Sequence, residues 1–176
     1  LGFVLTPSKR QITPEQAKEI IGELPDDVWK VGVFVNEPPE EVRMIAKIAG
    51  LTHIQLHGEE EVDLYKDIGK PLIKSVNVQT KADLDRLEGI EADYILLDGP
   101  SALLKGGNGK SFDWSLTTGI EKSGNIILAG GLTPENVKTA IGIVQPAMVD
   151  VSSGVETDGE KDLNKIRAFL EQAKGY

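Results

Sequence analysis

The sequence predicts an α/β domain with a parallel β-sheet, and two features of its pattern lead to that fold class. Short runs rich in Val, Ile and Leu recur along the whole chain, and most are apolar at consecutive positions. Such strands are covered on both faces, as in parallel sheets. Between the runs lie helical patterns with apolar residues three and four positions apart. The order is therefore strand, helix, strand, helix throughout.

Seven apolar runs are expected to form strands. In order, they cover residues 1–5, 31–35, 54–56, 72–76, 94–97, 126–129 and 148–151. No low-complexity linker divides the 176 residues. Because domains usually contain about 100–200 residues, we expect residues 1–176 to form a single α/β-barrel domain.

Capping residues mark the starts of two helices. Thr13-Pro14-Glu15-Gln16 offers a hydroxyl at the N-cap, proline in the first turn and glutamine at the capping-box position. Thr133-Pro134-Glu135 repeats the first part of this pattern. Further helices are predicted at about 39–50, 59–68, 80–89 and 161–174, the last between Gly159 and Gly175.

Composition excludes several classes of protein. With 28 acidic and 19 basic residues, the formal charge is −9, which repels polyanions and argues against a nucleic-acid partner. No stretch approaches the roughly 18 apolar residues of a membrane-spanning helix. The 176 residues contain no cysteine, so disulfides and thiolate metal sites within them are excluded. A sequence without cysteine fits a reducing compartment, and we expect a cytoplasmic location.

Polar and glycine-rich residues follow almost every predicted strand directly. They are Ser8-Lys9-Arg10, Asn36-Glu37, His57-Gly58, Asp98-Gly99, Gly130-Gly131 and Ser152-Ser153-Gly154. This distribution favours a ring of strands whose carboxyl ends converge on one site, and an open doubly wound sheet is the alternative. We therefore predict a (β/α)8 barrel with seven of its eight βα units present.

The first residues already read as a strand. Leu1-Gly2-Phe3-Val4-Leu5 has no initiator methionine and no signal-like cleavage context. We therefore expect an N-terminally truncated domain whose first βα unit is missing.

The last two strands are followed by candidate phosphate-binding loops, Gly130-Gly131 and Ser152-Ser153-Gly154. Glycines let backbone N–H groups approach an anion, and the last two βα loops of barrels often bind phosphate. The alternative is that these glycines only form tight turns.

Three side chains are candidates for chemistry or substrate binding. Asp98 ends an apolar strand and is a candidate general acid, or a turn-forming residue before Gly99. Arg10 could pair with a carboxylate through its guanidinium, or be a solvated loop residue. His57 could face the substrate, or bond to backbone in a turn.

No cofactor or metal is predicted. His53 and His57 are the only histidines, and spacing suggests no third ligand for a zinc site. The glycine-rich stretch 104–111 departs from the phosphate-binding loop of nucleotide hydrolases, because Leu104 stands where that motif has glycine. It is either a mobile lid or a surface excursion.

Further motifs occur in collinear order along the whole chain. They are Leu1-Gly2-Phe3-Val4, Ser8-Lys9-Arg10, Val31-Gly32-Val33-Phe34-Val35-Asn36, Gln55-Leu56-His57-Gly58, Leu96-Leu97-Asp98, Gly109-Lys110-Ser111-Phe112-Asp113-Trp114-Ser115, Leu128-Ala129-Gly130-Gly131-Leu132-Thr133-Pro134-Glu135-Asn136 and Val149-Asp150-Val151-Ser152-Ser153-Gly154-Val155-Glu156. In this combination the sequence resembles the phosphoribosylanthranilate isomerases of tryptophan biosynthesis.

The resemblance implies a (β/α)8 barrel and a cofactor-free Amadori rearrangement of N-(5-phosphoribosyl)anthranilate to 1-(2-carboxyphenylamino)-1-deoxyribulose 5-phosphate. It assigns Asp98 as the general acid, Arg10 to the anthranilate carboxylate and His57 to the lining of the site. It assigns the two C-terminal loops to phosphate and places Gly106–Lys110 on the loop after Asp98.

The family's general base is a cysteine at the end of the first barrel strand, and this sequence contains none. We therefore expect the 176 residues to be inactive as they stand. Alternatives are another phosphate-binding barrel enzyme, of the pentose-phosphate epimerase or indole-glycerol-phosphate synthase type, and a non-catalytic phosphate-binding fragment. Expected partners are a small phosphorylated substrate and either a second copy of the chain or a complementing N-terminal segment, with no nucleic acid or membrane.

Overall fold

The computed structural model describes residues 1–99, 113–117 and 123–174. The chain divides into two compact units. The first contains Leu1–Ser75 and Ile90–Tyr94, and the second contains Val76–Gly89 and Ile95–Tyr176. The expectation that residues 1–176 form a single barrel domain stays a prediction.

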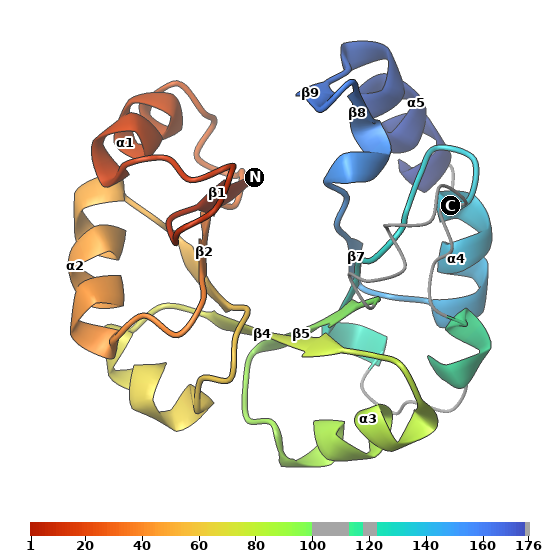
Figure 1. Cartoon of the computed structure of the whole chain (residues 1–176), viewed down its shortest axis with the longest axis horizontal. Coiled ribbons are helices and arrows are strands. Elements are labelled where there is room, and N and C mark those ends of the chain that lie inside the picture. Colours follow the sequence, from red (N-terminus) through yellow and green to blue (C-terminus); the bar gives the residue numbers. More distant parts are fainter. Residues whose placement is uncertain (100–112, 118–122, 175–176) are drawn as a thin grey trace. The chain divides into compact units, whose positions relative to one another are not determined.

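The first unit alternates parallel strands with helices. Its elements are β1 (Gly2–Val4), α1 (Pro14–Gly22), β2 (Val31–Phe34), α2 (Pro39–Ala49), β3 (His53–Leu56), a 3₁₀ helix (Val62–Ile68) and β4 (Leu72–Asn77), whose last two residues belong to the second unit. The strands pair in parallel in the order β1-β2-β3-β4. Helices α1 and α2 lie side by side along β1 and β2 (Figure 1).

The second unit repeats the alternation. Its elements are α3 (Lys81–Asp85), a 3₁₀ helix (Arg86–Gly89), β5 (Tyr94–Asp98), whose first residue belongs to the first unit, 3₁₀ helices at Trp114–Thr117 and Ser123–Asn125, β6 (Ile126–Leu128), α4 (Val137–Val144), β7 (Met148–Val149), a 3₁₀ helix (Ser153–Val155), β8 (Glu156–Thr157), β9 (Glu160–Lys161) and α5 (Leu163–Lys174). Strands β5, β6 and β7 pair in parallel in that order, and α4 lies beside α5 (Figure 1). The prediction of a parallel α/β fold is confirmed.

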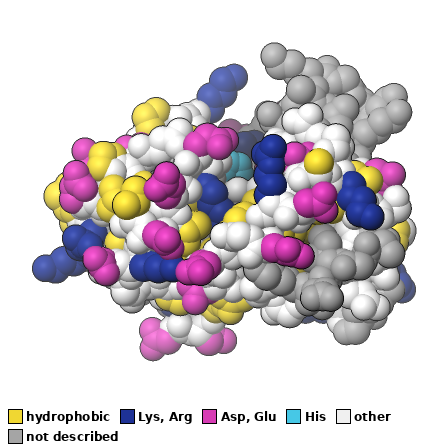
Figure 2. Space-filling model, turned by 90° about the horizontal axis from the view of Figure 1, so that it is seen from below, with side chains coloured by type: hydrophobic (Ala, Val, Ile, Leu, Met, Phe, Trp, Pro, Cys, Tyr) yellow, Lys and Arg dark blue, Asp and Glu magenta, His cyan; other side chains and the backbone are white. Residues whose placement is uncertain are grey.

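Each unit has a core of mainly apolar side chains. All four residues of β3 are buried, as are Ile95, Leu96 and Leu97 of β5. Strands buried at consecutive positions are covered on both faces, as the apolar runs predicted. Figure 2 shows acidic and basic side chains interspersed on one face of the molecule. Among the described residues, no helix is long and apolar enough to cross a membrane.

Helix α1 begins as the sequence predicts. The Thr13 hydroxyl accepts a hydrogen bond from the Gln16 N–H at 3.2 Å, and the Gln16 side chain accepts one from the Thr13 N–H at 2.9 Å. This reciprocal capping box satisfies two N–H groups that have no partner within the helix.

Helix α4 begins later than Thr133-Pro134-Glu135 suggested. The N-cap is Asn136, and the helix starts at Val137. The Asn136 side chain accepts from the Thr133 N–H at 2.8 Å and donates to the Gly131 carbonyl at 2.9 Å. Residues 133–136 therefore form a turn that is tied back to the loop after β6, and the predicted start was wrong.

Three other helix predictions differ from the structure. Residues 59–68 form a 3₁₀ helix only from residue 62, because the Glu60 carboxylate bonds to the backbone of Asn36 and Gly58. Residues 80–89 form the short α3 followed by a 3₁₀ turn. The helix predicted at 161–174 begins only at Leu163. Residues 156–161 instead form a β8–β9 hairpin, since Asp158 and Gly159 adopt the positive φ angles of a two-residue turn.

Candidate active site

Candidate residues occur in both units, at or just after the carboxyl ends of strands. Asp98, Gly130, Gly131 and residues 152–154 belong to the second unit, whereas Arg10 and His57 belong to the first. The stretch 104–111, including Gly106–Lys110, lies outside the described residues.

In the second unit, backbone hydrogen bonds align the ends of the parallel strands. The Ala129 N–H donates to the Leu97 carbonyl, and the Asp150 N–H donates to the Leu128 carbonyl, both at 2.8 Å. Asp98 is the last residue of β5, is half-buried, and accepts from the Val78 N–H through its own carbonyl at 2.8 Å. The sequence therefore placed Asp98 correctly at a strand end.

Gly130 brings the loop after β6 against the end of β5. Its φ of 79° lies in the left-handed region, and Gly131 follows with a φ of 68°. A Cβ at Gly130 would collide with the backbone N of Gly99 and would lie 2.9 Å from Asp98 Oδ1. The Asp98 carboxylate therefore lies directly beside the Gly130 backbone, where only glycine fits.

Gly154 makes the matching contact between the loops after β7 and β6. A Cβ there would collide with the Leu132 carbonyl oxygen and lie 3.3 Å from the Thr133 Cα. Ser152 and Ser153 beside it are exposed. The glycines thus have a packing role, and the same contact brings the two candidate phosphate loops together.

Two residues that hold these loops were not singled out from the sequence. Asn136 binds the Gly131 carbonyl, as described above. Lys161 donates to the Ser152 carbonyl at 2.8 Å and pairs with Glu156 at 2.8 Å. Lys161 belongs to β9, so its contact with Ser152 depends on the β8–β9 hairpin, which was not among the elements predicted from the sequence.

In the first unit, hydrogen bonds fix the position of His57. Its N–H donates to the Phe34 carbonyl at 2.8 Å, which continues the β2–β3 pairing. Its ring Nδ1 lies 3.1 Å from the side-chain nitrogen of buried Gln55, which also donates to the Ser75 hydroxyl at 3.2 Å. His57 is therefore held through both its backbone and its ring.

Arg10 is exposed in the loop between β1 and α1. Its backbone N–H donates to the Ser8 hydroxyl at 3.1 Å, and the Gln11 N–H donates to the Ser8 carbonyl at 3.2 Å. The local turn at Ser8 thus orients the backbone that carries the guanidinium.

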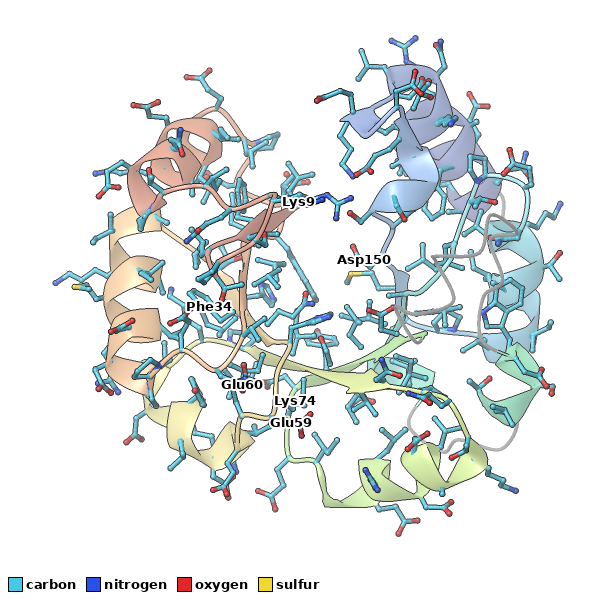
Figure 3. The ribbon with its side chains drawn as sticks, in the orientation of Figure 1. Lys9, Phe34, Glu59, Glu60, Lys74 and Asp150 are labelled. Atoms are coloured by element: carbon cyan, nitrogen blue, oxygen red, sulfur yellow. The ribbon has the colours of Figure 1, made fainter. Side chains whose placement is uncertain are left out.

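A buried ion pair lies beside the His57-Gly58 turn. Lys74 Nζ is 2.9 Å from Glu60 Oε2, and their side chains are only 11% and 1% exposed. Figure 3 shows Glu60, Lys74 and Glu59 close together. Burial alone would raise the pKa of Glu60, but hydrogen bonds from the Asn36 N–H and from Lys74 lower it below its ordinary value.

His53 lies at the opposite end of β3 from the His57 turn. Its ring stacks on Trp29 with centroids 3.8 Å apart, and the Thr52 hydroxyl is 2.8 Å from its Nδ1. Burial lowers the pKa of His53. Within residues 1–99, 113–117 and 123–174, no group of three His, Asp or Glu side chains could hold a metal ion.

Comparisons with known proteins agree on one family. The family model described as "N-(5'phosphoribosyl)anthranilate (PRA) isomerase" matches residues 1–172. An N-(5'-phosphoribosyl)anthranilate isomerase of Bacillus cereus is 51% identical over 176 residues, which cover 99% of this chain and 87% of the relative. A Bacillus mycoides enzyme of the same name is 50% identical, with 99% and 86% covered.

Solved structures agree with the sequence relatives. The phosphoribosyl anthranilate isomerase of Thermotoga maritima superposes with a TM-score of 0.87 at 46% identity, covering 99% of this chain and 87% of that one. The Thermus thermophilus enzyme gives 0.85 at 36% identity with the same coverage. At these identities and coverages, the chain belongs to the N-(5'-phosphoribosyl)anthranilate isomerase family.

Proposed function

We propose that this protein converts N-(5-phosphoribosyl)anthranilate to 1-(2-carboxyphenylamino)-1-deoxyribulose 5-phosphate in tryptophan biosynthesis. The observation that carries the proposal is a family match over residues 1–172, which includes every candidate residue. A solved relative, 44% identical with a TM-score of 0.84, is in complex with the reduced form of this product. In our proposal the fold is a (β/α)8 barrel of which these residues supply seven βα units, and the enzyme acts in the cytoplasm.

Asp98 is the general acid in this assignment. Its proton goes to the furanose ring oxygen as the C1–O bond breaks, and the nitrogen lone pair forms the C1=N bond of a Schiff base. Loss of the C2 proton to a base then gives an enolamine, which tautomerises to the ketone. The half-buried position of Asp98 beside the Gly130 backbone supports this role.

These residues do not supply the general base that removes the C2 proton. The family resemblance assigns it to a cysteine, and the 176 residues contain none. We therefore expect these 176 residues alone to bind the substrate without completing its isomerisation.

The loops after β6 and β7 bind the substrate phosphate in this proposal. Gly130 and Gly131 leave the backbone free of side chains, and the exposed Ser152 and Ser153 add hydroxyl donors beside Gly154. Backbone N–H groups of this kind bind anions without a lysine cluster, which reconciles a phosphorylated substrate with a net charge of −9.

Arg10 pairs with the anthranilate carboxylate and His57 lines the site. A planar guanidinium can donate two parallel hydrogen bonds to a carboxylate, which suits Arg10 better than a lysine in the same place. A second copy of the chain is the proposed protein partner, since the structure of one relative is described as that of monomers generated from a dimeric enzyme.

An Asp98→Asn variant tests the assignment. It is made in this chain joined behind a family-like first βα unit that carries the strand-end cysteine, so that turnover can be measured. We expect turnover before the change and its loss after it, with binding of inorganic phosphate retained, because asparagine keeps the size of aspartate without a transferable proton.

The matched control is Asp85→Asn at the exposed end of α3. Asp85→Asn should leave turnover unchanged. Near-normal turnover by a folded Asp98→Asn variant would contradict the role of Asp98.

A further inference from the structure

We infer that the buried Glu60–Lys74 ion pair positions His57 by fixing the turn that follows β3. We assign neither residue a catalytic role, because both side chains form their hydrogen bonds with the backbone of Asn36 and Gly58 and with each other. The inference deepens the proposed function and rests on it only for what His57 contacts.

The ion pair forms hydrogen bonds with both the N–H and the carbonyl of Gly58. Glu60 Oε2 accepts the Gly58 N–H at 2.9 Å, and Lys74 Nζ donates to the Gly58 carbonyl at 2.5 Å. The two charged groups also bind each other at 2.9 Å. Both peptide groups of the residue next to His57 are therefore hydrogen-bonded to one buried pair.

The same pair connects this turn to the loop after β2. Glu60 Oε1 accepts the Asn36 N–H at 2.7 Å, and Asn36 Oδ1 accepts the Glu59 N–H at 2.9 Å. Asn36 adopts a positive φ of 59°, and a Cβ at Gly58 would lie 2.5 Å from Asn36 Oδ1. The two loops therefore pack so closely that a side chain at position 58 would force the Asn36 side chain to shift.

The placement of the charges favours a positioning role over a purely stabilising one. Removing a carboxylate and an ammonium from water costs several kcal/mol per ion, so apolar residues of similar size often stabilise a fold equally well. Here the charges satisfy three backbone groups at the turn, the Asn36 N–H, the Gly58 N–H and the Gly58 carbonyl, and they also pair with each other. An apolar pair could fill the space but could not hold these backbone groups.

The ring of His57 depends on the same turn. Its backbone N–H is paired with Phe34 and its Nδ1 lies next to the Gln55 side chain. A shift of Gly58 would therefore move the Cα of His57 relative to Gln55 and turn the ring.

The experiment follows the two histidine ring resonances by NMR and measures binding of reduced 1-(2-carboxyphenylamino)-1-deoxyribulose 5-phosphate. The variants are Glu60→Gln, Lys74→Met and the double variant Glu60→Gln/Lys74→Met. Because the chain has only two histidines, His53 is an internal reference at the other end of β3. Lys66→Met is the matched control, since Lys66 pairs with Asp63 and Glu91 on the exposed surface of the same unit.

We expect the double variant to unfold at nearly the same temperature as the unaltered protein, since it leaves no unpaired charge. Its His57 resonances should nevertheless shift or broaden while those of His53 stay in place. The Kd of the reduced product should rise about tenfold, as misplacing a positioned group is costly. Lys66→Met should change neither readout.

A folded double variant with unchanged His57 resonances would overturn the inference, because the pair would then only stabilise the fold. If the double variant fails to fold, Glu60→Gln alone decides by the same two readouts. Failure of the unaltered protein to bind the reduced product would contradict the proposed function, while the His57 resonances would still test the positioning role.

Discussion

The two units hold the carboxyl ends of their strands by different means. In the first, the buried Glu60–Lys74 pair and Asn36 connect the loops after β2 and β3 through side chains. In the second, Gly130 and Gly154 allow the loops after β5, β6 and β7 to touch directly through their backbones.

The difference matches what each set of loops is proposed to bind. An imidazole must be oriented, and side-chain hydrogen bonds with defined directions do this for His57. A phosphate needs unobstructed backbone N–H groups, which glycine supplies. It follows that substitutions that remove a charge should have the larger effect in the first unit. Substitutions that add side-chain volume should have the larger effect in the second.

The largest effect is expected for Gly154→Ala. The new methyl group would collide with the Leu132 carbonyl, which is backbone and cannot rotate away. We expect the free energy of unfolding to fall by about 3 kcal/mol, measured by chemical denaturation, together with loss of phosphate binding.

Gly124→Ala is the matched control in the same unit, because among the described residues other than its chain neighbours no atom lies within 4 Å of where its Cβ would be. It should change stability by less than about 1 kcal/mol. Equal effects of the two substitutions would contradict the claim that the Gly154 contact is specific.

Lys74→Met is expected to have the next largest effect. It leaves the Glu60 carboxylate, 1% exposed, without its cation, which should cost about 3 kcal/mol in the free energy of unfolding. Adding Glu60→Gln should restore most of that loss. A double variant as unstable as Lys74→Met would show that the two charges are not coupled.

A smaller effect on the free energy of unfolding is expected when the pH is lowered and His53 takes up a proton. Burial lowers its pKa, Lys70 acts in the same direction and Asp93 opposes them. The unfolded chain therefore takes up a proton more readily than the folded one as the pH falls below about 6.5, so stability should decrease in that range.

His53→Gln should reduce the loss of stability between pH 7.5 and 5.5, measured by denaturation at each pH. Glu60 acts in a separate window, because its pKa is lowered from 4.5 and its contribution is lost only at more acidic pH. An unchanged pH dependence in His53→Gln would assign the effect to other groups.

Local patterns in the sequence identified much of the fold. The apolar runs located the seven parallel strands, and Thr13 to Gln16 formed the predicted capping box. Asp158-Gly159 is also a recognisable hairpin signal, although Gly159 entered the prediction only as the boundary of a helix.

Contacts between distant residues were the features that the sequence could not indicate. Glu60 and Lys74 are separated by 14 positions and lie on either side of a 3₁₀ helix, so no local period relates them. Asn136 likewise has two partners on the loop before its helix, Thr133 and Gly131, which capping rules alone do not combine.

The most direct test of the proposed site is a crystal structure of the protein with reduced 1-(2-carboxyphenylamino)-1-deoxyribulose 5-phosphate. We predict that the phosphate binds the backbone of Gly130, Gly131 and residues 152–154. We also predict the carboxylate at Arg10 and the former ring oxygen within hydrogen-bonding distance of Asp98. A phosphate bound instead at residues 106–109, with the loops after β6 and β7 empty, would contradict the assignment.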